Sequence, residues 1–136
     1  MMIEHEALYD LIAPYLDRQK AAAAPIAVAI CDGHGDLLFF LRMPSVSLHS
    51  GVLAQNKAYT AARDRQATQA IGEWSRQSGR MLSYWSDPRF TGFAGGVPLW
   101  LQGQVVAAVG ISGLSEAQDH ELASEIISVL GTYLNR

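Results

Sequence analysis

Residues 26–43 read IAVAICDGHGDLLFFLRM, and this stretch decides the fold. Its first part alternates larger and smaller apolar side chains: Ile26, Ala27, Val28, Ala29, Ile30 and Cys31. A turn rich in glycine and aspartate follows at 32–36, and a second apolar run extends over 37–43. Alternation with a period of two is typical of a β-strand, so two such runs around a short turn predict a β-hairpin.

A second hairpin is predicted in the last third of the sequence. Residues 97–101 and 104–112 are apolar runs joined by Gln102 and Gly103, where glycine supplies the positive φ that a tight turn needs. The longer run again has one larger and one smaller face, so both faces of the sheet are expected to be covered. Hairpins supply antiparallel neighbours without helical crossovers, which excludes a doubly wound parallel sheet.

Two helices are predicted around the first hairpin. Residues 3–23 have apolar side chains at near-helical spacing, with a kink expected at Pro14. Residues 47–70 follow the hairpin, and Ser47 is the expected N-cap. Small residues on one stripe of this second helix allow a close approach to the sheet: Ala54, Ala58 and Ala61.

The rest of the chain completes a mixed α/β (α+β) pattern. Residues 71–94 predict a shorter helix followed by a long loop. Residues 115–118, Ser-Glu-Ala-Gln, read as a capping box that opens a final helix. The inward stripe of that helix is apolar: Leu122, Ala123, Ile126, Ile127, Leu130 and Leu134.

The composition predicts a single domain over residues 1–136. The chain is 49% apolar and 17% charged, which disfavours disorder, and its length suits one domain. A formal net charge of -3 argues against a general nucleic-acid binder, which needs a basic surface. No charged residue stands between Arg89 and Glu116, but glycines, glutamines and a proline interrupt that stretch, so no membrane span is predicted. Cys31 is the single cysteine, and we expect a cytoplasmic protein.

Arg42 and Lys57 are candidate ligand-binding residues because few charges surround them in the sequence. Arg42 is the one charged residue between Asp36 and Lys57, at the end of a predicted strand, where a guanidinium can hold a carboxylate or phosphate. The alternative is a solvated strand end. Lys57 borders the alanine stripe that faces the sheet, so its ammonium is expected to reach a partner or a pocket. The alternative there is a side chain that extends to water.

The loop DPRFTGFAGGVP at 87–98 is a third candidate. Gly95 and Gly96 would let backbone amides approach a ligand or form a small anion-binding concavity. Arg89, Phe90 and Phe93 would form the wall of such a site. The alternative is a simple turn before the following strand.

Two further residues complete the candidate set. Asp119 is expected on the buried side of the last helix, in its first turn, where it would pair with Lys57 or Arg42 in a structural role. His49 is expected in the first turn of the helix that carries Lys57. The four histidines show no metal-ligand spacing, so no metal site is predicted. Cys31 is expected to be a core residue.

The sequence resembles the GlcG/HbpS-like family, often called the haem-degrading domain family, which also supplies the C-terminal domain of PduO-type corrinoid adenosyltransferases. Five segments carry the resemblance: 26–35, 41–43, 54–61, 95–99 and 110–119. Several residues fall on the shared pattern: Lys57, Gly95, Gly96, Ser112, Gly113 and Asp119. The segment 84–90 lies outside it.

The resemblance implies a profilin-like α/β/α sandwich around a five-stranded antiparallel sheet, assembled as a homo-oligomer, either a dimer or a larger ring. Members have been linked to haem binding, to accessory roles for corrinoid enzymes and to small-acid catabolism. Function in this family therefore varies more than the fold.

We expect a pocket between the Lys57 helix and the 89–98 loop, closed by a neighbouring subunit. In a first hypothesis the chain binds haem or a related tetrapyrrole as its cofactor. Arg42, Lys57 and Arg89 would then contact propionates, Phe90 and Phe93 the ring, and His49 the iron.

Two other hypotheses stay open. In the second hypothesis, the chain is an enzyme that acts on a small carboxylate-bearing metabolite. Arg42 or Arg89 would anchor the acid, and Lys57, His49 or Asp119 would move protons. Alternatively, it is an accessory or assembly module without chemistry of its own.

Overall fold

The computed structural model describes residues 3–135, and both predicted hairpins are present in it. The elements in chain order are α1 (His5–Ala21), β1 (Ala27–Asp32), β2 (Leu37–Arg42), α2 (Leu48–Asp64), α3 (Thr68–Ser78), the 3-10 helix η1 (Leu82–Trp85), β3 (Gly96–Leu101), β4 (Gln104–Ser112) and α4 (Glu116–Leu134). The predicted capping box opens α4, because the Ser115 hydroxyl accepts from the Gln118 amide while the Gln118 side chain accepts from the Ser115 amide.

The described residues form one antiparallel sheet of four strands in the order β2-β1-β4-β3. The five strands implied by the family resemblance are therefore wrong for this chain. The polypeptide between α2 and β3 is the longest stretch outside the hairpins, and it lacks the alternation of a strand. It folds instead as α3, η1 and a loop. Consequently β2 and β3 are the two edges of the sheet.

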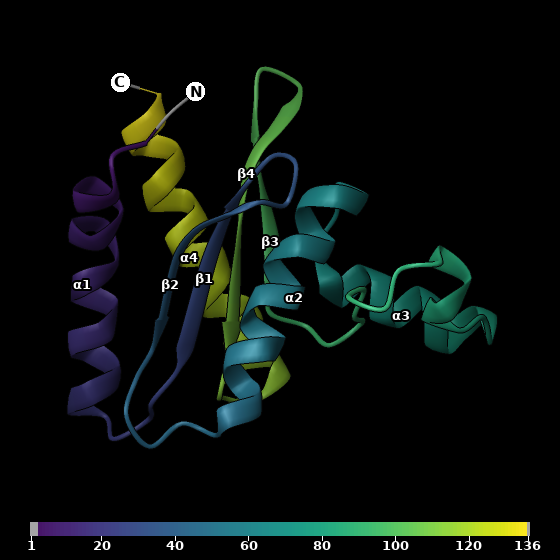
Figure 1. The fold of residues 1–136 in the computed structure, drawn as a ribbon, viewed down its shortest axis with the longest axis horizontal. Coiled ribbons are helices and arrows are strands. Elements are labelled where there is room, and N and C mark those ends of the chain that lie inside the picture. Colours follow the sequence, from purple (N-terminus) through teal and green to yellow (C-terminus); the bar gives the residue numbers. More distant parts are fainter. Residues whose placement is uncertain (1–2, 136) are drawn as a thin grey trace.

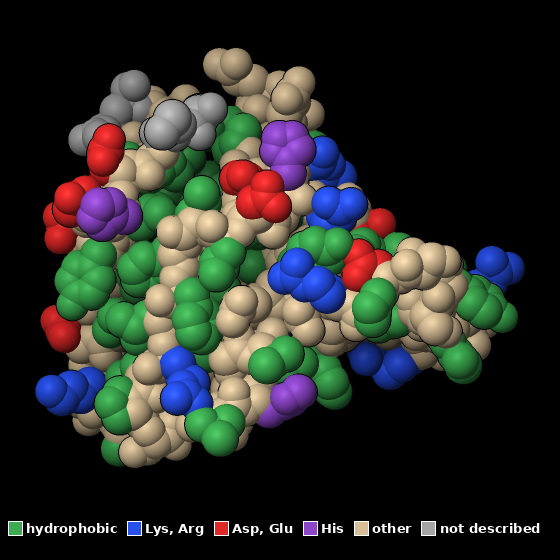
Figure 2. Space-filling view, in the orientation of Figure 1, with side chains coloured by type: hydrophobic (Ala, Val, Ile, Leu, Met, Phe, Trp, Pro, Cys, Tyr) green, Lys and Arg blue, Asp and Glu red, His purple; other side chains and the backbone are tan. Residues whose placement is uncertain are grey.

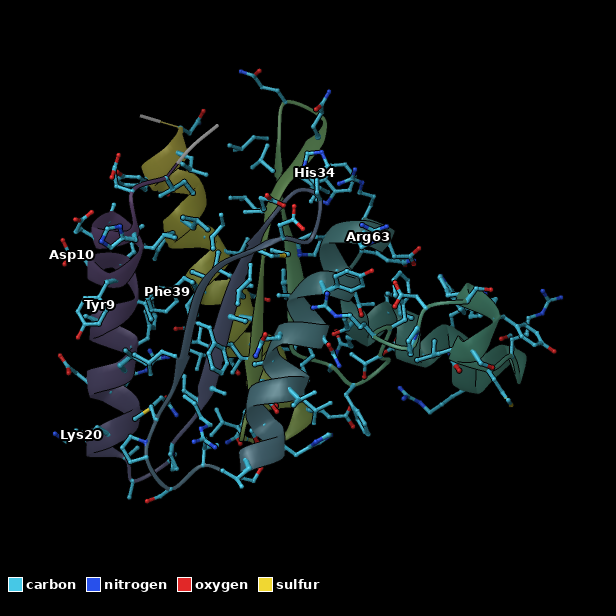
Figure 3. All side chains as sticks on the ribbon, viewed as in Figure 1. Tyr9, Asp10, Lys20, His34, Phe39 and Arg63 are labelled. Atoms are coloured by element: carbon cyan, nitrogen blue, oxygen red, sulfur yellow. The ribbon has the colours of Figure 1, made fainter. Side chains whose placement is uncertain are left out.

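Helices cover both faces of the sheet, as Figure 1 shows, with α1 and α4 on one side and α2 on the other. The larger apolar side chains of the strands meet α1 and α4, and Phe39 of β2 packs against this core (Figure 3). Members of this core include Leu8, Ile12, Val28, Ile30, Val109, Ile111, Ile126 and Leu130. Each buried aliphatic side chain of this size contributes about 1.5–3 kcal/mol to folding. The α/β/α sandwich is thus present.

The opposite face is built from small residues, which confirms the predicted alanine stripe. Ala54, Ala58 and Ala61 of α2 are fully buried against the smaller face of β1 and β4. A Cβ built on Gly110 of β4 would lie only 2.7 Å from the backbone nitrogen of Ala58. The helix backbone therefore lies directly on the strand, and no side chain fits between them.

The predicted 47–70 helix is broken into two parts. Helix α2 ends at Asp64, Arg65 adopts a left-handed conformation with φ of 60°, and α3 begins at Thr68. Together with η1, α3 forms a lobe that projects sideways from the sheet (Figure 1). The shorter helix followed by a loop that was predicted for 71–94 corresponds to this lobe. No helix among residues 3–135 has the length and apolar character needed to cross a membrane.

Candidate functional site

Lys57 and Asp119 form a buried ion pair that joins α2 to the start of α4. The Lys57 ammonium lies 3.1 Å from Asp119 Oδ2 and donates a second hydrogen bond of 2.8 Å to the Ile111 carbonyl. The other carboxylate oxygen of Asp119 accepts from the Leu114 amide at 3.0 Å. Each of the two charged residues is 2% exposed. The predicted structural pairing of Asp119 with Lys57 is therefore present, and the alternative of a solvated lysine is wrong.

Burial dominates the electrostatics of this pair. Loss of hydration lowers the pKa of Lys57 and raises the pKa of Asp119, and the attraction between the two charges opposes both shifts. Two donor positions of the Lys57 ammonium and both carboxylate oxygens of Asp119 have hydrogen-bond partners in the protein. The structure thus places Lys57 and Asp119 inside the fold, away from solvent.

Gly95 and Gly96, at the start of β3, pack against the same ion pair. Gly95 has φ of +127°, and a Cβ on it would lie 3.0 Å from the Lys57 ammonium nitrogen. A Cβ on Gly96 would lie 2.8 Å from the Lys57 carbonyl carbon, and the Gly96 amide donates to Thr68 Oγ1 at 2.9 Å. The glycines allow the backbone to approach protein atoms, so the space of the expected anion-binding concavity is filled by Lys57 and its neighbours.

Side chains of the helices hold the loop that precedes the glycine pair. The Thr91 amide donates to Thr60 Oγ1 of α2 at 3.2 Å, and the Ala94 amide donates to Glu116 Oε1 of α4 at 3.0 Å. These two bonds come from helices on opposite faces of the sheet. The backbone of the loop is therefore held by both helices.

Arg89 at the start of this loop is fixed by three residues. Its guanidinium carbon lies 3.8 Å from the centre of the Tyr59 ring, and its Nε donates to Asn56 Oδ1 at 3.3 Å. Its backbone amide donates to Asp87 Oδ1 at 2.9 Å. The Tyr59 hydroxyl donates to the other oxygen of Asp87, and this hydrogen bond raises the pKa of Tyr59 and lowers the pKa of Asp87.

Arg89 opens onto a groove between α2 and the β1–β2 turn. The groove has a volume of about 380 Å³, and its lining consists of Gly35, Asp36, Leu37, Val52, Gln55, Asn56 and Arg89. One wall carries polar side chains, while Leu37 and Val52 are apolar. Figure 3 shows His34 of the turn beside Arg63 of α2, where the Arg63 guanidinium donates to the His34 carbonyl at 3.1 Å. That bond joins the β1–β2 turn to α2.

Arg42, the last residue of β2, and His49, in the first turn of α2, are both exposed. A Cβ on Gly51 of α2 would lie 3.5 Å from Arg42 Cδ and 3.2 Å from the ring of Phe40, so β2 and α2 are in contact here. Four large apolar side chains at this junction are exposed by 38–76%, and we call them the α2–β2 strip: Leu37, Phe40, Leu48 and Val52. Figure 2 shows such hydrophobic side chains over β2 and the start of α2, with Lys or Arg side chains beside them.

Phe90 and Phe93 point away from that strip. Phe90 packs edge-on against Tyr59 at 6.0 Å between ring centres and lies 6.3 Å from Trp85. Both phenylalanines line a separate hollow of about 290 Å³ beside α3. The structure therefore places Arg42 beside α2 and His49 at the start of that helix, both exposed, and Arg89 at the groove. It places Phe90 and Phe93 at a different hollow.

Cys31 is a core residue, as predicted. Its thiol donates to the Ala58 carbonyl at 3.3 Å, and burial raises the pKa of this thiol to about 12. The closest gathering of metal-ligand atoms in residues 3–135 is an exposed group at the start of α1, formed by Glu4, His5 and Glu6. Exposed acidic groups of this kind are common without an ion, so no metal centre is assigned.

Tyr59, Asn56 and Asp87 are the site residues that sequence reasoning missed. Asn56 and Tyr59 are three positions apart and thus share one face of α2, which is visible in the sequence. Asp87 stands two residues before Arg89 in an Asp-Pro-Arg turn, which is also visible. Their meeting depends on the fold of the 79–94 loop over α2, which no local pattern encodes.

Comparison with known proteins places this chain in a family. The corrinoid adenosyltransferase PduO of Salmonella typhimurium is 30% identical over 125 residues, which cover 90% of this chain and 37% of that protein. The chain thus spans less than two fifths of that relative. The solved PduOC:haem complex superposes with a TM-score of 0.83 at 29% identity over 95% of both chains. HbpS superposes with a TM-score of 0.82 at 25% identity over 96% of this chain and 92% of that one. The sequence profile described as "haem degrading protein HbpS-like" matches residues 3–128, and the chain therefore belongs to the HbpS-like family.

Proposed function

We propose that this chain binds haem or a related tetrapyrrole. The observation that carries the proposal is the likeness to the PduOC:haem complex, which extends over 95% of both chains. The description of the family as haem-degrading supports the same ligand. A bound haem would supply a redox-active iron, and the chain would supply the apolar and basic surface that holds it.

The α2–β2 strip fits such a ligand. Its apolar side chains suit the face of a macrocycle, because an exposed cluster of large hydrophobic residues marks a binding surface more often than a solvated one. Arg42 lies beside Gly51 of α2, and Arg89 lines the same groove as Leu37 and Val52, so both can pair with propionates. His49 directly follows Leu48 on α2 and is the candidate ligand for the iron.

The remaining predicted site residues support the fold in this proposal. Lys57 has its hydrogen bonds inside the protein, and Gly95 and Gly96 pack against it. Phe93 is exposed by 55% on the other side of the loop and would meet the same ligand only from a neighbouring subunit. We propose a homo-oligomer on the same ground, since the exposed strip of one copy would then be covered by another.

A haemin titration followed by absorbance tests the proposal. The wild-type chain is expected to shift the Soret band at micromolar protein, and His49→Ala is expected to change the position or intensity of that band. Arg42→Ala and Arg89→Ala are expected to weaken binding by about tenfold each, the loss of one charged hydrogen-bonded pair. Arg80→Ala, at an exposed arginine outside the strip and the groove, is the matched control and keeps wild-type binding. Absence of a Soret shift in the wild type would refute haem binding.

A small carboxylate-bearing metabolite is the second candidate ligand. The observation that favours it is the groove of about 380 Å³ at Arg89, which suits a small molecule. The structure gives Lys57 and Asp119 no access to a ligand, so proton transfer by these residues is not part of this candidate. Binding of a small acid without any change in the haemin spectrum would favour it over the tetrapyrrole.

A further inference from the structure

We propose that the groove between α2 and the β1–β2 turn is a binding site for a small zwitterion, whose carboxylate pairs with Arg89 and whose ammonium pairs with Asp36. The proposal rests on the small-ligand candidate above and does not require haem. Both charged residues line the same groove, together with two carboxamides and two apolar side chains.

Contacts with the protein hold the Arg89 side chain in place before any ligand binds, and they leave one edge of its guanidinium free. The Tyr59 ring occupies one face of the guanidinium, Asn56 accepts from Nε, and Asp87 fixes the backbone of the same residue. The two terminal nitrogens have no hydrogen-bond or ion-pair partner among the described residues. Two parallel N–H donors remain, which is the arrangement that binds a carboxylate with two hydrogen bonds. Because the side chain is already ordered, binding costs little conformational entropy.

Asp36 supplies the opposite charge. Its backbone is fixed by a pair of hydrogen bonds with Asp32, of 2.9 Å from the Asp32 amide and 3.0 Å to the Asp32 carboxylate. The carboxylate of Asp36 makes no hydrogen bond or ion pair with the residues that the structure describes. No ion pair joins Asp36 to Arg89 among the described residues, although both line the groove. The two charges are thus separated by space that a ligand can fill.

This pair of charges selects for a zwitterion. A dianion would meet repulsion from Asp36, and a lone cation would meet repulsion from Arg89. A molecule with one carboxylate and one ammonium satisfies both, and the groove volume admits a small amino acid. Leu37 and Val52 would contact the carbon atoms between the two charged ends, while the Gln55 and Asn56 carboxamides offer further hydrogen bonds.

Nuclear magnetic resonance titration of the full chain tests the proposal. The signals to follow are the Arg89 Nε–H and the side-chain amides of Gln55 and Asn56. The probes are glycine and 4-aminobutyrate as zwitterions, acetate as a carboxylate alone, and ethylammonium as a cation alone. At least one zwitterion is expected to bind about fivefold or more tightly than acetate and ethylammonium, because it gains a second charged contact.

Two substitutions and one control sharpen the test. Asp36→Asn is expected to reduce zwitterion affinity to that of acetate, and Arg89→Lys to weaken every carboxylate probe, since lysine lacks the planar fork. Arg80→Lys, an exposed arginine outside the groove, is expected to bind as the wild type does. A wild-type preference for zwitterions below about fivefold, or an unchanged preference in Asp36→Asn, overturns the proposal. A Soret shift without zwitterion binding would refute this site alone, and selective zwitterion binding without a Soret shift would refute only the haem proposal.

Discussion

The Lys57–Asp119 pair shows how the fold accommodates two charged side chains in its core. A charge that loses its water in the core is tolerated when a partner and further hydrogen bonds replace that water. Here the Ile111 carbonyl accepts from Lys57, and the Leu114 amide donates to Asp119, which supplies the further hydrogen bonds. Removing one partner leaves the other charged and unpaired, whereas removing both leaves an apolar site, so the pair is expected to show strong coupling.

Single and double substitutions measure that coupling. Lys57→Met and Asp119→Leu are each expected to lower the free energy of unfolding by about 3–5 kcal/mol, and the double variant by much less than the sum. Urea denaturation at neutral pH gives the three values. The matched control is the Arg18–Glu125 pair, which is exposed and 2.9 Å long, and Arg18→Met should cost at most about 1 kcal/mol. Additive losses at Lys57 and Asp119 would argue against a coupled buried pair.

At the scale of elements, the close contact between α2 and the sheet positions the candidate site. The backbone of α2 lies on β4 because Gly110 and the alanine stripe leave no side chain between them. This contact fixes the outward face of α2, which carries Val52, Asn56 and Tyr59. A shift of the helix would therefore move one wall of the groove relative to the β1–β2 turn.

Gly110→Ala tests this contact. The added methyl would meet the backbone of Ala54 and Ala58, which cannot move without shifting α2, so we expect a loss of about 2–3 kcal/mol in the free energy of unfolding. Gly131→Ala in α4 is the control, since its methyl would meet only the end of the Leu99 side chain at 3.1 Å. There the gain in helix propensity, about 1 kcal/mol, offsets the crowding. Equal effects of the two substitutions in urea denaturation would contradict the close-contact argument.

For the molecule as a whole, the strands and the last helix were predictable because local patterns encode them. The alternation at 26–31 and the capping box at 115–118 each specify one conformation without distant contacts. The break after Asp64 was missed because Arg65 adopts a left-handed conformation that its side chain does not favour, supported by its hydrogen bonds to the Gly33 and Ala62 carbonyls. Tertiary contacts decide that position.

The candidate site was predictable only in part, for the same reason. Arg42, Arg89 and His49 were predicted from their types and sequence surroundings; all three are exposed, and their binding roles stay predictions. Lys57 was identified as unusual, but a lysine that reaches a ligand and one that reaches a buried carboxylate have the same helical position. The side chains of Arg89 and Phe90 line different hollows because the path of their loop depends on hydrogen bonds to α2, α3 and α4 together.

The stability of the whole molecule is expected to fall in alkaline solution through Cys31. Its thiol ionises in the unfolded chain from the ordinary pKa of 9.0, whereas burial holds the folded pKa at about 12. Between these values the unfolded state binds fewer protons, so the free energy of unfolding decreases with pH by up to about 1.4 kcal/mol per unit. Cys31→Ala removes this contribution and leaves the other titrating groups in place. Urea denaturation under reducing conditions gives the difference in free energy of unfolding between wild type and Cys31→Ala. This difference should be constant below about pH 9, and above that pH the wild type should lose stability relative to the variant. A difference that stays constant up to about pH 10.5 would mean that the thiol ionises in the folded core as readily as in water.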